Sequence, residues 1–570
     1  MLTKFDQIRN ALDLGGNWQM FEDPSGTMMC PSYGAQGFRT VTLPADIAHC
    51  IPERPYAEGV YWFLRRVTVP GGYLNKRIAL RFDAVNYEAS VFVGNTFICR
   101  SEQGFLPFEC DITNAVHPGC ETEICVRVDT RRCPGQIPTS FFWKNCGGIL
   151  RDITLYATDY SYIADAYVIA DHNGKAVCKA EIAAKSDDLE VAIRILDESG
   201  SEIAADTCPA DNFSAFEFVT PDIRAWSPDS PVLYSAEFTL LRKGLPVDRV
   251  MRTFGYRTIE AKDGKIYLNG EEIFLRGYNR HEDHPSVGGA ASSAAVDSDF
   301  AHIKASGANF IRMCHYPHDV RELDAADRLG LCLLVEIPMC GYGGSRLGIH
   351  NAEAPIYNEA VYCAARECLV RMIRRDRSHP SVILWSVSNE NEEPEENVIR
   401  NQDALIRIAK QMDPSRLATH VSNHARHKER NTFFREDDVI CFNTYRTIFG
   451  RIYNKNREFD PREAGDAIAA TADGLRKDFP TKPVIVSEFG YRTCDSFDGP
   501  EDEDIQAAAV AAEYEGARRS ANGATVWLYA DHLWPKDNGL AGDVSEYGLL
   551  RRDRCEKKAF RVYSDLMKKG

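Results

Sequence analysis

The sequence predicts a multidomain protein in which two β-rich domains precede a (β/α)8 barrel, the TIM barrel architecture. Two observations lead to this fold class. Up to about residue 257, short segments alternate apolar and polar residues, as strands with one buried face do. From about residue 258, strongly apolar strands alternate with amphipathic helices, the pattern of a parallel sheet that is buried on both faces.

The two β-rich domains are expected at residues 1–160 and 161–257. In the first, "RIALRFDAVNYEASVFVGN" and "EICVRVDT" alternate apolar and polar residues, and turn signals separate the segments. In the second, "EVAIRILD", "SAFEFVT" and "YSAEFTLLR" recur at the spacing of an immunoglobulin-like β-sandwich, with the turn-like "SPDSPVLY" between them.

The barrel is expected at residues 258–570, because this region holds eight strand–helix units. The expected strands are 272–277, 308–313, 331–337, 381–387, 417–422, 438–443, 483–488 and 524–530. The expected helices include "DVRELDAADRLG", "AVYCAARECLVRMIRRDR", "ENVIRNQDALIRIAKQM" and "IQAAAVAAEYEGARRS". The loops after strands 3, 6 and 8 are long, which favours a role in binding.

Composition and charge narrow the class of protein. The formal net charge of −16 argues against nucleic acid as a partner, because phosphates would be repelled. We find no secretory signal and no apolar stretch of the length that a membrane span needs. The 18 cysteines are scattered and form no CxxC pair, so we expect reduced thiols in the cytoplasm and no metal site.

The candidate active site follows from the barrel, whose active sites lie at the C-terminal ends of the strands. Glu390 ends strand 4 and Glu488 ends strand 7, nearly opposite each other across the barrel mouth. Two carboxyl groups about 5–5.5 Å apart suit a retaining glycosidase, with one acting as acid and the other as nucleophile. A phosphate-binding loop, a Schiff-base lysine and a serine nucleophile elbow are missing from these ends, so no cofactor is expected.

Other residues at the strand ends are candidates for substrate binding. Asn389 is placed to bond the sugar 2-hydroxyl. His281 and His315 are either sugar ligands or capping residues, and Trp527 is either a stacking platform or part of the core. Glu336 is expected to be a buried support residue. Asn443, Tyr445 and Arg446 complete the set at the end of strand 6.

Several motifs in register resemble glycoside hydrolase family 2, which includes β-galactosidases, β-glucuronidases and β-mannosidases. They are "LGGNW", "GGILRDITLY", "FGYRTIE", "LRGYNRHEDHP", "IRMCHYP", "SVSNEN" and "VSEFG". The resemblance implies that the first domain is a jelly-roll sugar-binding-type domain. It also implies that Glu390 is the acid/base, that Glu488 is the nucleophile, and that Tyr445 bonds the nucleophile.

The sugar is less clearly indicated. "TVWLYADH…YGLLRRDR…KKAF" resembles β-glucuronidases, but "DVSEYG" stands where they carry an Asn-x-Lys motif for the sugar carboxylate. "GYNRHEDHP" resembles β-galactosidases instead. Arg446, Arg492 and Lys536 are cations that could meet a carboxylate, unless they are solvated surface charges. We expect a retaining exo-β-D-glycosidase of the β-hexuronidase type (β-galacturonidase or β-glucuronidase), acting by double displacement on terminal non-reducing sugars.

Two alternatives stay open: a neutral-sugar β-galactosidase and a catalytically dead carbohydrate-binding protein. Phe142, Trp143 and Asn145 could reach the barrel mouth from the first domain or merely pack at the domain interface. The expected partners are a small-molecule or oligosaccharide β-glycoside and further copies of the same chain, so a homo-oligomer is expected. Nucleic acid and membranes are not expected as partners.

Overall fold

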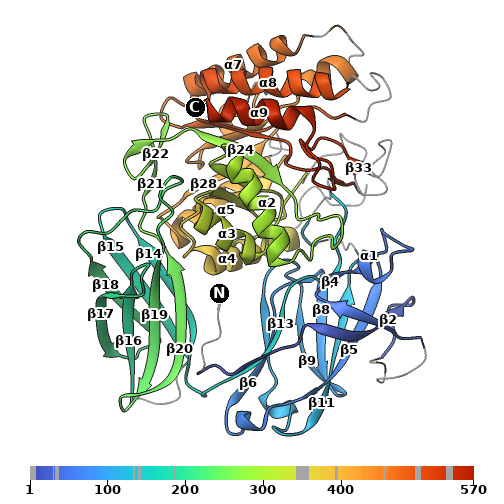
Figure 1. The fold of residues 1–570 in the computed structure, drawn as a ribbon, viewed down its shortest axis with the longest axis vertical. Coiled ribbons are helices and arrows are strands. Elements are labelled where there is room, and N and C mark those ends of the chain that lie inside the picture. Colours follow the sequence, from blue (N-terminus) through green and yellow to red (C-terminus); the bar gives the residue numbers. More distant parts are fainter. Residues whose placement is uncertain are drawn as a thin grey trace.

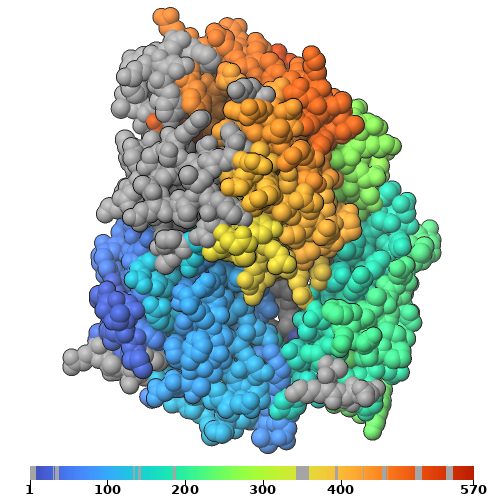
Figure 2. Space-filling model, turned by 180° about the vertical axis from the view of Figure 1, so that it is seen from behind, coloured from blue at the N-terminus to red at the C-terminus, as the bar shows by residue number. Residues whose placement is uncertain are grey.

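The structure is a computed structural model that describes residues 8–29, 31, 37–131, 135–138, 143–183, 188–341, 359–391, 396–427, 429–453, 458, 460–493, 502–534 and 544–569. Two β domains lie side by side beneath a helix-covered barrel (Figure 1). The view from behind shows the same arrangement, with the blue and green domains below the yellow and orange barrel (Figure 2). The fold class predicted from the sequence is therefore confirmed.

The first domain consists of antiparallel sheets with strand orders β1-β13-β6-β10, β3-β2-β5-β11-β8-β9 and β4-β12-β7. The inward residues of facing sheets, such as Phe63 of β5 and Leu80 of β6, are fully buried in one core. The elements are β1 Ala11–Asp13, β2 Gly16–Asp23, β3 Arg39–Leu43, β4 Ala45–Asp46, α1 Ile47–Cys50, β5 Val60–Thr68, η1 Gly71–Tyr73, β6 Arg77–Phe82, β7 Val85–Asn86, β8 Glu88–Val93, β9 Thr96–Ser101, β10 Phe108–Asp111, η2 Thr113–Ala115, β11 Glu121–Asp129, β12 Gly148–Ile149 and β13 Ile153–Thr158.

The second domain is a sandwich of two antiparallel sheets, with strand orders β14-β15-β18 and β17-β16-β19-β20. Every second residue of β16 is buried, as Val191 and Ile193 are, because alternate side chains of a strand point to opposite faces. The strands are β14 Tyr162–Ala170, β15 Lys175–Ala183, β16 Leu189–Leu196, β17 Glu202–Pro209, β18 Phe213–Val219, β19 Tyr234–Arg242 and β20 Leu245–Phe254.

The barrel is closed by eight parallel strands in the order β24 to β31, as the sequence predicted. The strands are β24 Leu275–Arg280, β25 Phe310–Met313, β26 Cys332–Glu336, β27 Val382–Asn389, β28 Leu417–Ser422, β29 Ile440–Asn443, β30 Val484–Phe489 and β31 Gly523–Val526. Around them lie α2 Ser293–Ala305, α3 Val320–Leu329, α4 Glu359–Asp376, α5 Glu396–Met412, η3 Arg430–Thr432, α6 Arg446–Ile448, η4 Phe449–Tyr453, α7 Pro461–Asp478, α8 Asp502–Ser520 and α9 Lys558–Lys568. Parts of the three long loops lie outside the described residues.

Two barrel strands differ from their predicted limits by more than two residues. The expected first strand, 272–277, begins too early, because Glu271 and Glu272 pair with β22. This antiparallel sheet, β21 Ile259–Lys262, β22 Lys265–Leu268 and β23 Glu271–Glu272, precedes the barrel and was not predicted. The last strand ends at Val526 rather than near residue 530. Beyond it, Trp527 and Tyr529 still donate to the carbonyls of Phe489 and Asn279, whereas Leu528 donates to the carbonyl of Tyr547. The hairpin β32 His532–Leu533 with β33 Val544–Ser545 follows.

Buried arginines join the two β domains to opposite ends of the barrel. Arg151 of the first domain bonds Glu282 at 3.2 Å and the carbonyl of Pro317 at 2.9 Å, beside the C-terminal strand ends. Arg257, after the second domain, bonds the carbonyls of Pro380 and Val382 at the N-terminal end of β27. The first domain therefore adjoins the barrel mouth.

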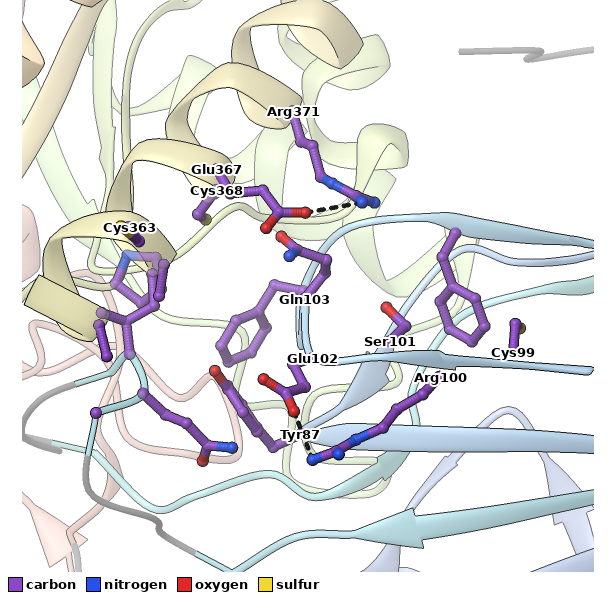
Figure 3. Close-up of a pocket in the computed structure, with 18 of the residues that line it drawn as sticks. Tyr87, Cys99, Arg100, Ser101, Glu102, Gln103, Cys363, Glu367, Cys368 and Arg371 are labelled. Carbon is purple, nitrogen blue, oxygen red and sulfur yellow. Dashed lines mark ion pairs between the residues drawn. The ribbon is translucent and has the colours of Figure 1, made fainter. Parts of the chain in front are cut away.

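A cavity of about 620 Å³ lies between the first domain and α4 (Figure 3). Four of its charged side chains form two ion pairs, Glu102 with Arg100 at 2.5 Å and Glu367 with Arg371 at 2.9 Å. Phe105 lines the cavity and also stacks on Tyr316, with 4.5 Å between the ring centroids.

The cysteines depart from expectation at one place. Cys99 of β9 and Cys110 of β10 form a disulfide, so the prediction of reduced thiols throughout is wrong for this pair. The two strands bring these residues within a Cα–Cα distance of 6.2 Å, inside the range that a disulfide needs. The other thirteen cysteines of the described chain form no disulfide. None of the described helices combines the length and the apolar character that a membrane crossing requires.

Candidate active site

The C-terminal ends of the barrel strands bring the two predicted glutamates into one site. Glu488 lies within β30, and Glu390 directly follows β27. The charge of Glu488 raises the pKa of Glu390, so the two carboxyl groups lie within reach of each other's field. Glu390 has a φ of +51°, a left-handed conformation that is uncommon for a residue with a side chain. Its backbone N–H is held by the carbonyl of Val421 at 2.8 Å.

The carboxylate of Glu488 is buried between strong hydrogen-bond donors. Arg312 donates from Nη1 to Oε1 at 2.5 Å, and the hydroxyl of Tyr445 donates a short hydrogen bond to Oε2. Burial raises the pKa of Glu488, but the positive charge of Arg312 and the hydrogen bond from Tyr445 oppose that shift. Both groups stabilise the ionised form.

Glu390 has a different environment, because its hydrogen-bond donors among the described residues are all neutral. Asn443 donates from Nδ2 to Oε1 at 2.7 Å, and Asn423 donates from Nδ2 to Oε2 at 3.3 Å. Burial and the nearby charge of Glu488 raise the pKa of Glu390 to about 7, although the hydrogen bond from Asn443 lowers it. Of the two glutamates, Glu488 therefore loses its proton first.

Arg312, which sequence reasoning missed, lies at the centre of the site. Besides Glu488, it bonds Asn389 Oδ1 at 2.8 Å, Asn279 Oδ1 at 3.0 Å, and both oxygens of Glu336 at 2.9 and 3.0 Å. Its exposed fraction is 0%. The available signal was an arginine inside the apolar run "ANFIRM", since a charge in a doubly buried strand must be paired.

Glu336 and Asn389 both accept hydrogen bonds from Arg312 and bond other residues of the site. Glu336 accepts from Ser386 Oγ at 2.7 Å and bonds His315 Nδ1 at 2.7 Å, as expected of a buried support residue. Asn389 accepts from Arg312 and from Asn443, and its Nδ2 donates to Cys340 Sγ at 3.2 Å. The amide of Asn389 thereby orients both the arginine and the asparagine that bonds Glu390.

The predicted histidines lie beside each other at the site. His281 and His315 have ring centroids 5.3 Å apart, and burial lowers the pKa of both, so both rings are neutral near pH 7. His281 Nδ1 bonds the hydroxyl of Tyr316 at 3.3 Å. Its Nε2 is buried and has no hydrogen-bond partner within the described chain, so it is available to a ligand.

Two tryptophans enclose the histidines. Trp527 stacks on His315 with 5.3 Å between centroids and is 5% exposed. Trp143 of the first domain lies 5.4 Å from the ring of His281 and 5.6 Å from that of His315, so the first domain contributes to this wall. Asn145 bonds Asn86 and the carbonyl of Thr130 within its own domain. Phe142 lies outside the described residues.

The candidate cations for a sugar carboxylate differ in environment. Arg446 begins α6, directly after Tyr445, and its Nε is buried without a hydrogen-bond partner among the described residues. Burial lowers the pKa of Arg446, and so does the charge of Arg426, a second cation in this region that sequence reasoning missed. Arg492 is half-buried in the segment after β30. Lys536 lies outside the described residues.

One cluster beside the site has the geometry of metal ligands but not their chemistry. Ligand atoms of His281, Cys314 and His315 lie within 4.8 Å of one another. Cys314 Sγ, however, donates to the carbonyl of Arg280, and burial raises the pKa of this thiol well above its usual range. The thiol therefore stays protonated, whereas a metal ion binds the thiolate.

Comparisons with known families cover nearly the whole chain. Residues 7–159 match "Glycosyl hydrolases family 2, sugar binding domain", residues 161–257 match "Glycosyl hydrolases family 2", and residues 259–563 match "Glycosyl hydrolases family 2, TIM barrel domain". A β-glucuronidase of Paenibacillus borealis is 28% identical over 480 residues, 78% of each chain. A β-galactosidase of Thermoanaerobacter pseudethanolicus is 28% identical over 396 residues, 66% of this chain and 51% of that protein.

Solved structures share the fold at lower identity. The β-glucuronidase of Ruminococcus gnavus superimposes with a TM-score of 0.88 at 23% identity, covering 100% of this chain and 98% of that one. The same enzyme has been solved in complex with D-glucuronic acid. The family matches extend the resemblance seen in the sequence motifs to all three domains. The chain thus belongs to glycosyl hydrolase family 2 and is a retaining glycoside hydrolase of the β-glucuronidase-like kind.

Proposed function

We propose that the protein is a retaining exo-β-D-glycosidase in which Glu488 is the nucleophile and Glu390 the acid/base. The observation that carries this assignment is the contrast between the two carboxyl groups. Glu488 is bonded by a guanidinium and a phenol, whereas Glu390 is bonded by amides and has a pKa of about 7. A nucleophile must be ionised and an acid must hold a proton at working pH.

In the first step, a carboxylate oxygen of Glu488 forms a bond to the anomeric carbon and the glycosidic C–O bond breaks. Glu390 transfers its proton to the departing oxygen, which leaves Glu390 ionised. In the second step, Glu390 takes a proton from a water molecule. The water oxygen then bonds to the anomeric carbon, and the ester bond to Glu488 breaks.

The surrounding residues set the two protonation states and orientations. Tyr445 and Arg312 orient the two oxygens of Glu488 by donating to one each. Asn443 orients Glu390, and Ser487 Oγ in turn donates to Asn443 Oδ1 at 2.9 Å. Neutral imidazoles at His281 and His315 suit hydroxyl groups of a sugar, and Trp527 and Trp143 form an apolar wall beside them.

For the sugar, we propose a β-D-hexuronide, either a galacturonide or a glucuronide. A buried carboxylate requires a cationic partner. Arg446 and Arg426 meet this need, because Arg446 forms no ion pair within the described residues and its buried Nε has no hydrogen-bond partner there, although the charge of Glu513 lies near it. The β-glucuronidase relatives favour the same substrate class. Arg446 is our first choice, since a guanidinium can hold a carboxylate with two hydrogen bonds.

A neutral β-galactoside is the second candidate. The stretch that replaces the Asn-x-Lys motif contributes Tyr547, whose ring packs 5.8 Å from that of Tyr445. An aromatic ring cannot replace the charge of a lysine. The β-galactosidase of Thermoanaerobacter pseudethanolicus is among the relatives, and "GYNRHEDHP" is similar to the strand 1 motif of such enzymes.

A panel of aryl β-galactoside, β-galacturonide, β-glucuronide, β-glucoside and β-mannoside tests the sugar. We expect the best turnover on a uronide, and we expect Arg446→Ala to lose that activity while any galactoside rate is retained. Arg407→Ala is the matched control, because Arg407 is an arginine on the surface of α5 that pairs with Glu436. Efficient hydrolysis of the plain galactoside with the uronides untouched would establish a β-galactosidase instead.

We also propose a cytoplasmic location and a homo-oligomer. The cysteines support the first, since thirteen described cysteines form no disulfide. Strand β18, at the edge of its sheet, supports the second, because Phe213 and Val219 are 74% and 79% exposed. Sedimentation analysis tests the assembly, and a monomer at micromolar concentration would contradict it.

A further inference from the structure

A buried carboxylate outside the ring of strand ends makes three hydrogen bonds to the segments that follow β29 and β30. Glu513 of α8 is 0% exposed. Its Oε1 accepts from the backbone nitrogen of Thr447 at 3.0 Å and from Thr447 Oγ1 at 2.7 Å. Its Oε2 accepts from the backbone nitrogen of Gly490 at 3.0 Å. One side chain therefore connects two loops at the barrel mouth.

The two loops carry the partners of the short hydrogen bond at the nucleophile. Thr447 comes two residues after Tyr445, and Gly490 comes two residues after Glu488. Tyr445 and Glu488 are themselves joined by the phenol–carboxylate bond. Glu513 thus holds both backbone segments from the helix side, while Tyr445 and Glu488 meet on the inner side.

The segment after Glu488 has little freedom of its own. Gly490 has a φ of +150°, and a Cβ there would lie 2.5 Å from the carbonyl oxygen of Trp527. The backbone nitrogen of Thr444 also donates to the carbonyl of Glu488 at 2.8 Å. A change in how Glu513 holds Gly490 therefore has few ways to relax other than a shift of Glu488 or Tyr445.

The environment of Glu513 is unfavourable for a carboxylate that only supports the fold. Within the described chain it forms no ion pair, and burial raises its pKa to about 7. The nearby charge of Arg446 lowers that pKa, but less than the three hydrogen bonds do. A neutral side chain would be less costly to bury, since desolvation penalises the charged form.

We propose that Glu513 is a positioning residue, which fixes the Tyr445–Glu488 pair by holding Thr447 and Gly490 with one carboxylate. This inference rests on the proposed role of Glu488 as nucleophile. In the free enzyme, Glu513 sets the register between the two loops, so that the phenol reaches one oxygen of Glu488 and leaves the other aligned with Arg312.

Glu513→Gln tests the proposal, because the amide offers an N–H where one of the backbone donors now points. We expect kcat to fall by up to about 10²-fold, the loss that a small misplacement of reacting groups causes. KM should change less than twofold, and the loss should be equal for good and poor leaving groups. Glu513→Asp, which keeps the charge but shortens the reach, should recover part of the rate.

The pH profile separates positioning from mere support of the fold. A weakened bond from Tyr445 raises the pKa of Glu488, whose other titratable neighbours are Arg312, Glu336, Glu390, Cys314 and Cys340. The acidic limb of kcat/KM should therefore move to higher pH in Glu513→Gln. Thr447→Val removes the hydroxyl that donates to Glu513 and should shift the acidic limb in the same direction, but by less. This variant tests the proposal if Glu513→Gln folds poorly.

Asp327→Asn is the matched control. Asp327 of α3 is 2% exposed and accepts from the backbone nitrogen of Ser381 at 2.9 Å, at the opposite end of the barrel. The Asp327→Asn variant should have a lower melting temperature, with kcat and the acidic limb of kcat/KM unchanged. If Glu513→Gln behaves like Asp327→Asn, the positioning role is wrong. If Glu488→Gln, measured in parallel, stays active, the proposed function itself fails.

Discussion

Arg312 donates from Nη1 to Glu488 at 2.5 Å while its Nη2 bonds both oxygens of Glu336. One guanidinium thereby compensates the negative charge of two buried carboxylates. The guanidinium is itself fully buried. The planar fork of an arginine matches this arrangement, whereas an ammonium group is a single bonding centre.

Arg312→Lys should therefore reduce activity although it keeps the charge. We expect kcat to fall by ~10²-fold, a loss typical of removing one donor preorganised at a reacting group. The measurement is steady-state kinetics together with thermal unfolding. Arg407→Lys changes an exposed ion pair and should alter neither kcat nor the melting temperature. Wild-type kcat in Arg312→Lys would show that the guanidinium only stabilises the fold.

Glu488→Gln should abolish turnover of every substrate, because an amide cannot form the glycosyl-enzyme ester. The variant should still fold, since the amide oxygen can accept from Arg312 while the amide NH2 donates to the hydroxyl of Tyr445. Hydrolysis of the preferred aryl glycoside by this variant, at any rate above the background, would remove Glu488 from the nucleophile role.

Glu390→Gln should be selective for the leaving group. Poor leaving groups need the proton of Glu390, whereas activated aryl oxides depart with little protonation. General acid assistance contributes ~10²–10⁴-fold, so alkyl glycosides should lose that much more than nitrophenyl glycosides. A plot of log kcat/KM against leaving-group pKa measures the difference. Equal losses across the series in both glutamate variants would contradict the assignment of roles.

The pH dependence should follow the pKa of Glu390, which burial and Glu488 raise to about 7. The acid is protonated below that pH, so kcat/KM should fall as pH rises above about 7. In Glu390→Gln, the basic limb should disappear when an activated aryl glycoside is the substrate. A basic limb that persists unchanged in the variant would assign it to another group.

Thiol titration tests the state of the cysteines. Protein denatured without reductant and kept anaerobic should release every thiol except those of Cys99 and Cys110, which are joined. The double variant Cys99→Ser/Cys110→Ser should release the same number of thiols as the wild type. Markedly fewer thiols in the wild type would indicate further disulfides and contradict a reducing compartment.

The barrel could be predicted from the sequence because each of its strands is buried on both faces and reads as a continuous apolar run. The limits of a strand are set by pairing, which no single segment encodes. Glu272 was therefore assigned to the first barrel strand, although the structure pairs it with Tyr267 in an antiparallel hairpin.

The two glutamates could be predicted because each ends a recognisable strand. Of the residues around them, Tyr445 and Glu336 were also predicted, whereas Arg312 and Glu513 were not, since their bonding partners lie far away in sequence. Glu513 belongs to the helical stretch "AAEYEGARRS" and looks like a solvent-facing charge beside the arginines. Trp143, which was predicted either to reach the barrel mouth or to pack at the interface, lies against the histidines where Arg151 bonds the first domain to Glu282.

The left-handed backbone of Glu390 bears on how such an enzyme could lose its activity in evolution. A residue with a side chain at φ +51° costs roughly 1–2 kcal/mol relative to a relaxed conformation. Replacement of Glu390 by glycine removes this strain and also the buried carboxyl. The inactive barrel should therefore be the more stable protein. Mutation to a non-catalytic descendant would then increase the free energy of unfolding. Only selection for turnover retains the strained glutamate.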